Sequence, residues 1–171
     1  EVLSLAGRGT RVVDLGGRTV LPGLIDSHNH LLEAGTKLSM LRLDECRTPA
    51  AMAELVRHRA ETVAPGTWII GQGWNEANFP AGRLPSRADV DGATSLHPVL
   101  LMRFFNTDLV NSVALQMAGV TAGTTDPVDG VIGRDETGEP NGLLGAAART
   151  LVRRLIPQPS GSDLRAALRL A

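Results

Sequence analysis

The chain has 171 residues, of which 43% are hydrophobic and 3% aromatic, and its 17 basic and 18 acidic residues leave a net charge of −1. These values are typical of an ordinary globular domain or part of one, and they argue against nucleic-acid binding, which needs basic or aromatic surfaces. The sequence shows no signal peptide and no apolar run long enough to span a bilayer, so we expect no membrane partner. Because Cys46 is the only cysteine, no internal disulfide is possible; we expect a structural thiol and a cytoplasmic protein.

The first 23 residues have the pattern of β-structure. Two short apolar runs, at 11–15 and 18–21, are joined by Gly16 and Gly17. Both glycines can adopt positive φ, so the pattern predicts a two-residue hairpin.

The next segment ends in two histidines that are one residue apart. We expect a strand from Leu24 to about Asp26, with His28 and His30 at its C-terminal end. In an extended chain these two imidazoles project to the same side, so they could bind one metal ion. The spacing equally fits two strand-end residues that only form hydrogen bonds.

A helix and two buried strands are predicted next. Thr48 and Pro49 are typical of a helix start, and Pro65 and Gly66 of a helix stop. Between them, apolar residues at spacings of three and four predict a buried stripe of Met52, Leu55, Val56, Ala60 and Val63, with His58 exposed. The apolar runs 68–71 and 98–102 predict strands, and His97 precedes the second of them.

The long connection 72–95 is the first candidate for a substrate pocket, because long loops often carry function. Trp74, Asn75 and Glu76 follow the strand at 68–71, and Arg103 follows the strand at 98–102. An amphipathic ring, an amide and charged groups at strand ends could bind a small molecule. Trp74 could instead pack over the apolar groups of its own loop.

The rest of the chain shows a helix, a hairpin and two further helices. Asn111 and Gly119 are typical of the start and stop of a helix, and residues 129–142 predict a hairpin with its turn near Glu136–Gly138. From Leu143 onward the apolar spacing predicts a helix that ends before 157–159. A last helix is predicted to begin with Ser162 as its N-cap.

Several strings in this order resemble amidohydrolase family 3 of the amidohydrolase superfamily, the branch that includes N-substituted formamide deformylase. They are Thr19–His30, Gly71–Glu76, Arg83–Asp89, His97–Arg103, Asn111–Leu115 and Arg134–Gly142. The resemblance implies an α/β fold in which 24–171 form the first strands and helices of a (β/α)8 TIM-type barrel, and 1–23 form part of a flanking β-sandwich. A complete barrel needs about 250 residues. We therefore expect the chain to be an N-terminal part, with further ligands and the catalytic groups beyond Ala171.

The resemblance also implies the chemistry. His28 and His30 would bind a divalent metal, most simply zinc and one or two ions, that activates water to hydrolyse a C–N bond of amide or formamide type. A small-molecule substrate and possible homo-oligomers are the expected partners. By itself this chain should be inactive.

Two positions depart from the family pattern. The family usually has Gly-His where this chain has Phe105-Asn106, and a glutamate where it has Ala146. Asn106 can form hydrogen bonds to a substrate but cannot carry a proton near neutral pH. These departures favour one alternative, a non-catalytic relative that serves as an interaction scaffold. A deaminase of a cyclic substrate is a further alternative, because deaminases and amidases use the same water chemistry.

Overall fold

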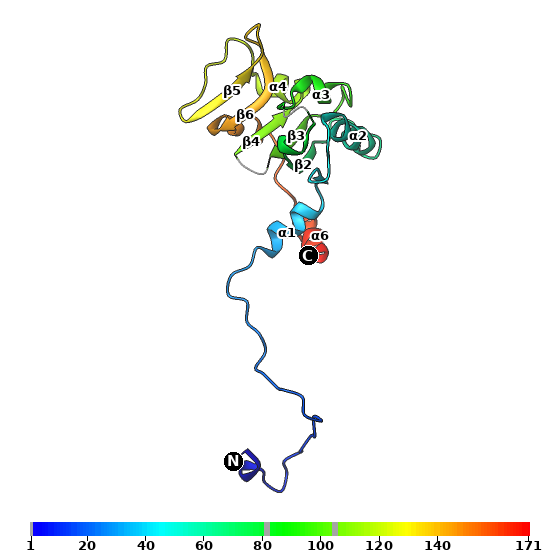
Figure 1. The fold of residues 1–171 in the computed structure, drawn as a ribbon, viewed down its shortest axis with the longest axis vertical. Coiled ribbons are helices and arrows are strands. Elements are labelled where there is room, and N and C mark those ends of the chain that lie inside the picture. Colours follow the sequence, from blue (N-terminus) through cyan, green and yellow to red (C-terminus); the bar gives the residue numbers. More distant parts are fainter. Residues whose placement is uncertain (1, 81–82, 104–105) are drawn as a thin grey trace.

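A six-stranded mixed sheet forms the centre of the fold (Figure 1). The structure, a computed structural model, describes residues 2–80, 83–103 and 106–171. The strands are β1 (Leu41–Arg42), β2 (Ile69–Trp74), β3 (Val99–Arg103), β4 (Thr107–Val110), β5 (Gly130–Arg134) and β6 (Pro140–Ala146), and they lie in the order β1-β2-β3-β4-β6-β5. The pairs β1–β2 and β2–β3 are parallel, and all other pairs are antiparallel.

The two strands predicted at 68–71 and 98–102 are confirmed as parallel neighbours, β2 and β3. The strand beside β2 is β1 and not the predicted 24–26 segment. Within the described residues the sheet is open and three of its five strand pairs are antiparallel, because the strand after β3 is β4, which returns beside it. The first strands of a parallel barrel therefore remain a prediction from the family resemblance.

Helices cover both faces of this sheet. Residues of α2 (Pro49–Ala60) and α3 (Arg87–Asp91) pack in one buried cluster with Ile69, Leu101 and Leu109. Residues of α4 (Ser112–Ala118) and α5 (Thr150–Arg153) pack in a second cluster with Leu100, Val110 and Leu144. The alternation of these strand residues between two clusters is the expected period of two.

Most predicted helix starts are confirmed because they depend on local hydrogen bonds. The Thr48 side chain accepts a hydrogen bond from the amide of Ala51, and Ser86 forms a capping box with Asp89. Asn111 caps α4, and Gly119 ends it with φ of 67°. The stripe of α2 is partly wrong: Ala53 is buried, whereas Leu55 is exposed, and the helix already ends at Ala60.

Strand β2 extends three residues beyond its predicted end. Its register shifts between Gln72 and Trp74, and Gly73 at this bulge has φ of 92°. A bulge of this kind favours glycine. The pairing of β2 with β3 therefore continues past the polar residues from which we predicted a loop. The connection to β3 then contains η2 (Glu76–Asn78) and α3, while its residues 81–82 lie outside the described ranges.

The prediction of a helix from Leu143 onward is wrong. The predicted hairpin is confirmed, with its turn closed by the amide of Asp135 donating to the carbonyl of Glu139. However, β6 continues to Ala146, because it lies between β4 and β5 and its backbone pairs on both sides. Of the helix predicted from Leu143 onward, only the part that contains η3 (Ala147–Arg149) and α5 is helical.

Two helices, α1 (Leu31–Leu38) and α6 (Gly161–Leu170), pack against each other beside the sheet (Figure 1). The contact is close at Gly35, which is buried against Ala167. Helix α6 begins earlier than predicted, because Ser160 and not Ser162 forms the capping box with Asp163. We call residues 41–156, which lie between these helices in the sequence, the sheet unit.

The N-terminal part of the chain extends away from α1 (Figure 1). It contains η1 (Val2–Leu5) and a turn at the predicted Gly16 and Gly17, but no strand from 6 to 30. The predicted hairpin strands and the strand at 24–26 are therefore wrong here. Leu24 and Ile25 are 97% and 90% exposed. Two short strands with no sheet or helix to pack on are marginally stable in water.

Two further expectations concern the whole chain. Cys46 is buried as expected, and burial raises the pKa of its thiol, which fits a structural residue. Among the helices in the described ranges, none combines the length and the apolar character needed to cross a bilayer.

Candidate metal centre and sheet-end residues

His28 and His30 direct the same ring nitrogen toward each other. Their Nε2 atoms lie 3.1 Å apart, and the ring centroids are separated by 5.1 Å. Two nitrogens bound to one tetrahedral zinc ion, each at about 2.05 Å, are about 3.3 Å apart. The side chains therefore have the spacing of two ligands to a single ion, which is also that of a hydrogen bond between the two rings, and they belong to an irregular segment and not to a strand.

A carboxylate holds the other side of the His30 ring. Glu33 Oε2 lies 3.1 Å from His30 Nδ1, and Lys37 Nζ lies 2.7 Å from Glu33 Oε1. The hydrogen bond from Lys37 lowers the pKa of Glu33, so the carboxylate is ionised and can only accept. It therefore fixes the proton of a neutral His30 on Nδ1 and leaves the Nε2 lone pair facing His28, as in carboxylate–histidine–metal arrangements.

This donor set fits a divalent ion but does not complete its coordination. Within the described residues no group of three or more histidine, cysteine or acidic side chains is close enough to hold a metal. His97 is excluded by its position, since it is buried before β3 with its Nδ1 3.0 Å from the carbonyl of Thr67. His58 is exposed on α2, as predicted.

The residues at the ends of β2 and β3 form a second group. Trp74 is 0% exposed, and its indole N–H donates to the carbonyl of Leu101 over 2.8 Å, so the ring lies in the core. Arg103 pairs with Glu76, and its guanidinium lies 6.0 Å from the centroid of the Trp74 ring. Asn75 accepts a hydrogen bond from the amide of Ala77 and caps η2.

Glu76 has an oxygen that the rest of this group does not satisfy. Its Oε2 atom is buried and has no hydrogen-bond partner among the described residues. A buried acceptor of this kind normally has a partner. Of the four residues predicted here, Glu76 and Arg103 are therefore the two that the structure brings together with unused hydrogen-bonding capacity, whereas Trp74 and Asn75 contact their own surroundings.

Asn106 and Ala146, the two departures from the family pattern, are in direct contact. The amide of Ala146 donates to the carbonyl of Asn106 over 3.0 Å. Arg149 connects the same two residues, because its Nε donates to the carbonyl of Ala146 at 3.0 Å and its Nη2 to Oδ1 of Asn106 at 2.5 Å. Phe105, the other half of the first departure, lies outside the described ranges.

Sequence reasoning missed Arg149 and its neighbour Arg153. Arg153 forms two hydrogen bonds to Asp108, a carboxylate that is 1% exposed, and these bonds raise the pKa of the arginine. The signal was present: the two arginines are four residues apart on one helix face, and Asn106 and Asp108 are two apart along a strand direction. The spacings alone did not show that the arginines are bonded to Asn106 and Asp108, because that depends on how the chain folds.

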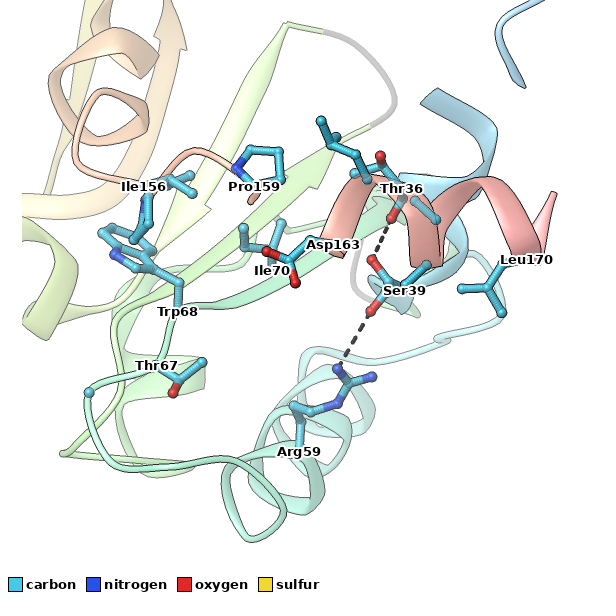
Figure 2. A pocket seen from close by; sticks show the side chains of 15 residues that line it. Thr36, Ser39, Arg59, Thr67, Trp68, Ile70, Ile156, Pro159, Asp163 and Leu170 are labelled. Carbon is cyan, nitrogen blue, oxygen red and sulfur yellow. Dashed lines mark hydrogen bonds between the residues drawn. The ribbon is translucent and has the colours of Figure 1, made fainter. Parts of the chain in front are cut away.

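A groove separates the helix pair α1–α6 from the sheet unit (Figure 2). It has a volume of about 700 Å³, with Trp68 and Ile70 of the sheet side facing Asp163 and Leu170 of α6. At one border Arg59 donates to the carbonyl of Ser39, which is drawn as a dashed line in Figure 2. A second, shallower hollow of about 690 Å³ lies beside His30 and shares Thr36 with this groove.

Comparison with known proteins shows the family to which the chain belongs. The model of the amidohydrolase family Amidohydro_3 matches residues 11–171, so the chain belongs to this family. It is 40% identical over 95% of its length to Protein LONG AFTER FAR-RED 3 of Arabidopsis thaliana, and 36% identical over 88% to the putative amidohydrolase YtcJ of Bacillus subtilis. It is 32% identical over 89% of its length to an N-substituted formamide deformylase of Arthrobacter pascens.

The chain spans 28%, 29% and 29% of these three relatives, which is less than a third of each. A crystal structure of an uncharacterized metal-dependent hydrolase from Pyrococcus furiosus is also similar, with a TM-score of 0.58 and 26% identity. This likeness covers 86% of the chain and 28% of that structure. The recognition of the family from the sequence is thus confirmed.

Proposed function

We propose that this chain carries part of the metal site of a hydrolase that cleaves a C–N bond of amide or formamide type. The observation that carries the proposal is the 3.1 Å approach of the Nε2 atoms of His28 and His30, with Glu33 behind the second ring. The family membership and the formamide deformylase among the relatives support the same reaction class.

The roles of the individual side chains follow from their chemistry. A divalent ion, most simply zinc, supplies a water whose pKa is lowered to about 7 and polarises the substrate oxygen. His28 and His30 provide two nitrogen ligands, and Glu33 keeps His30 in the tautomer that can bind. Asn106 and the pair of Glu76 and Arg103 offer hydrogen bonds to a small organic substrate.

The test measures metal content and hydrolysis together. The protein expressed from its natural gene is purified without chelators beside the 171-residue chain, and release of aniline from N-phenylformamide is followed with zinc or manganese. A catalytic zinc normally has three protein ligands, so we expect turnover from the former and metal binding without turnover from the latter. Loss of both metal and turnover in His28→Ala, but not in His58→Ala, supports the proposal; full activity of the metal-free protein contradicts it.

A non-catalytic scaffold is the second candidate, and the replacement of the usual histidine and glutamate by Asn106 and Ala146 favours it. The same experiment separates the two. A scaffold would bind no stoichiometric metal and would show no turnover of N-phenylformamide, whereas the hydrolase shows both.

A further inference from the structure

The described chain has three non-glycine residues with positive φ, and all three meet at one end of the sheet. Asn106, Asp129 and Ala146 have φ of 35°, 57° and 49°. The register pairs Thr107 with Gly145 and Gly130 with Ala146, so the three lie side by side at the ends of β4, β5 and β6. The amide of Ala147 also donates to the carbonyl of Asp129 over 3.1 Å. Strained backbone of this kind concentrates at binding sites, where the surrounding structure maintains it.

Arg149 determines which way the side chain of Asn106 points. A guanidinium has only donors, so the atom 2.5 Å from Nη2 must be the carbonyl oxygen of the amide. Oδ1 is thus directed toward Arg149, and the NH2 group of the exposed Asn106 is directed away from it. The second bond of Arg149, to the carbonyl of Ala146, prevents the guanidinium from rotating away. The result is a fixed pair of N–H donors at the sheet end.

Two adjoining hollows lead from His30 along the surface as far as Arg153, near this end of the sheet. Thr36 and Pro159 line both the hollow beside His30 and a groove of about 630 Å³ that reaches Arg153. Arg153 is one helical turn beyond Arg149 and is held in place by the buried Asp108. A substrate that lies along this surface from His30 would therefore extend toward Arg153, which is four residues beyond the arginine bonded to Asn106.

We propose that Asn106 is a substrate-binding residue whose NH2 group donates to a carbonyl or carboxylate oxygen of the substrate, and that Arg149 is the positioning residue for this amide. The proposal rests on the proposed hydrolase function and adds a substrate class: molecules with an oxygen acceptor away from the bond that is cleaved. Arg149 itself contacts only the protein, because its bonds to Asn106 and Ala146 hold it.

The test uses binding and not turnover, so it is independent of whether the protein hydrolyses any amide. The 171-residue chain, labelled with ¹⁵N, is titrated with acetamide as a carbonyl probe and with acetate as a carboxylate probe. The side-chain NH2 signal of Asn106, assigned by its absence in Asn106→Asp, is expected to shift to saturation with at least one probe. The probe that binds more tightly identifies the acceptor.

Three variants separate positioning from simple folding. Arg149→Ala should weaken binding at least tenfold, whereas Arg154→Ala, at the exposed C-cap of α5, should leave it unchanged. Asn106→Asp keeps an acceptor for Arg149 but loses the NH2 donors. It should therefore remain folded and lose binding of the probe. Because the NH2 signal is absent in this variant, binding is measured from the shifts of the backbone amides of Ala146 and Arg149. The absence of any shift in the parent chain overturns the proposal, as does unchanged affinity in Asn106→Asp. Unchanged affinity in a folded Arg149→Ala variant overturns the role of the arginine.

Discussion

Gly35 in α1 lies so close to Ala167 in α6 that a Cβ atom at Gly35 would be 1.9 Å from the carbonyl oxygen of Ala167. A carbon and an oxygen that are not bonded to each other do not approach to this distance, and the backbone cannot move aside as the end of a long side chain can. The absence of a side chain at Gly35 is therefore what allows the two helices to pack together.

The first prediction is that Gly35→Ala separates α1 from α6. Despite the better helix propensity of alanine, we expect a loss of about 1–3 kcal/mol in the free energy of unfolding, as for other overpacked contacts. Urea denaturation followed by circular dichroism measures it. Gly92→Ala is the control, because nothing lies within 4 Å of a Cβ at that position. Equal effects of the two substitutions would show that the contact is not tight.

The second prediction concerns Glu33, the carboxylate behind His30. Glu33→Gln should lower zinc affinity about 10- to 100-fold, the usual effect of removing a partner of a metal-bound histidine. His28→Ala and His30→Ala should lower it further, and the exposed His58→Ala should not. Competition with a chromophoric zinc indicator gives the affinities. Zinc binding that is equal in Glu33→Gln and the parent chain would remove Glu33 from the site.

The third prediction concerns the ion pair between Asp108 and Arg153. Asp108 is 1% exposed, whereas Arg153 is 38% exposed and water can partly replace its lost partner, so Asp108→Ala should lower the free energy of unfolding by about 1.5–3 kcal/mol. The exposed pair of Arg42 and Asp44 is the comparison, and Asp44→Ala should lower the free energy of unfolding much less, because water and salt screen an exposed pair. Chemical denaturation of the two variants decides whether burial makes the difference.

The fourth prediction is a dependence of stability on acid through Asp89. Hydrogen bonds from Arg83, and then from Ser86, lower the pKa of this carboxylate below its usual value. A group with a lowered folded-state pKa stabilises the protein above its unfolded-state pKa of about 3.9, and the contribution is lost as the pH falls through the folded-state pKa.

Asp89→Asn should therefore lower stability at pH 6 and should differ less from the parent chain as the pH approaches 3. Urea midpoints at several pH values between 6 and 3 measure this difference. Glu136→Gln, at an exposed turn position, is the control and should follow the parent chain at each pH. A constant difference over the whole range would contradict an electrostatic origin.

The parts of the fold that the sequence predicts are those decided within a few residues. Thr48 and Asn111 cap their helices as predicted because each bond joins groups three residues apart. The convergence of His28 and His30 is also local, and it appears even though the strand that motivated it does not form.

The parts that failed depend on partners far along the chain. The run after Leu143 has helical spacing, but pairing with β4, more than 30 positions earlier, makes it a strand. The spacing of Arg149 and Arg153 did not identify the partner of Arg149, because Asn106 is 43 residues away. The open, mixed sheet likewise results from β4 turning back beside β3, which no periodicity within a single strand indicates.

The side-by-side packing of α1 and α6 has a consequence for how this family can vary. Because α1 and α6 pack side by side, the chain leaves the helix pair and returns to it at nearly the same place. The sheet unit between them is therefore an insertion whose two ends lie close together. A segment attached in this way could be lengthened or replaced while α1 and α6 still pack against each other. The same junction could be used to exchange the sheet unit of the molecule while the helix pair is retained.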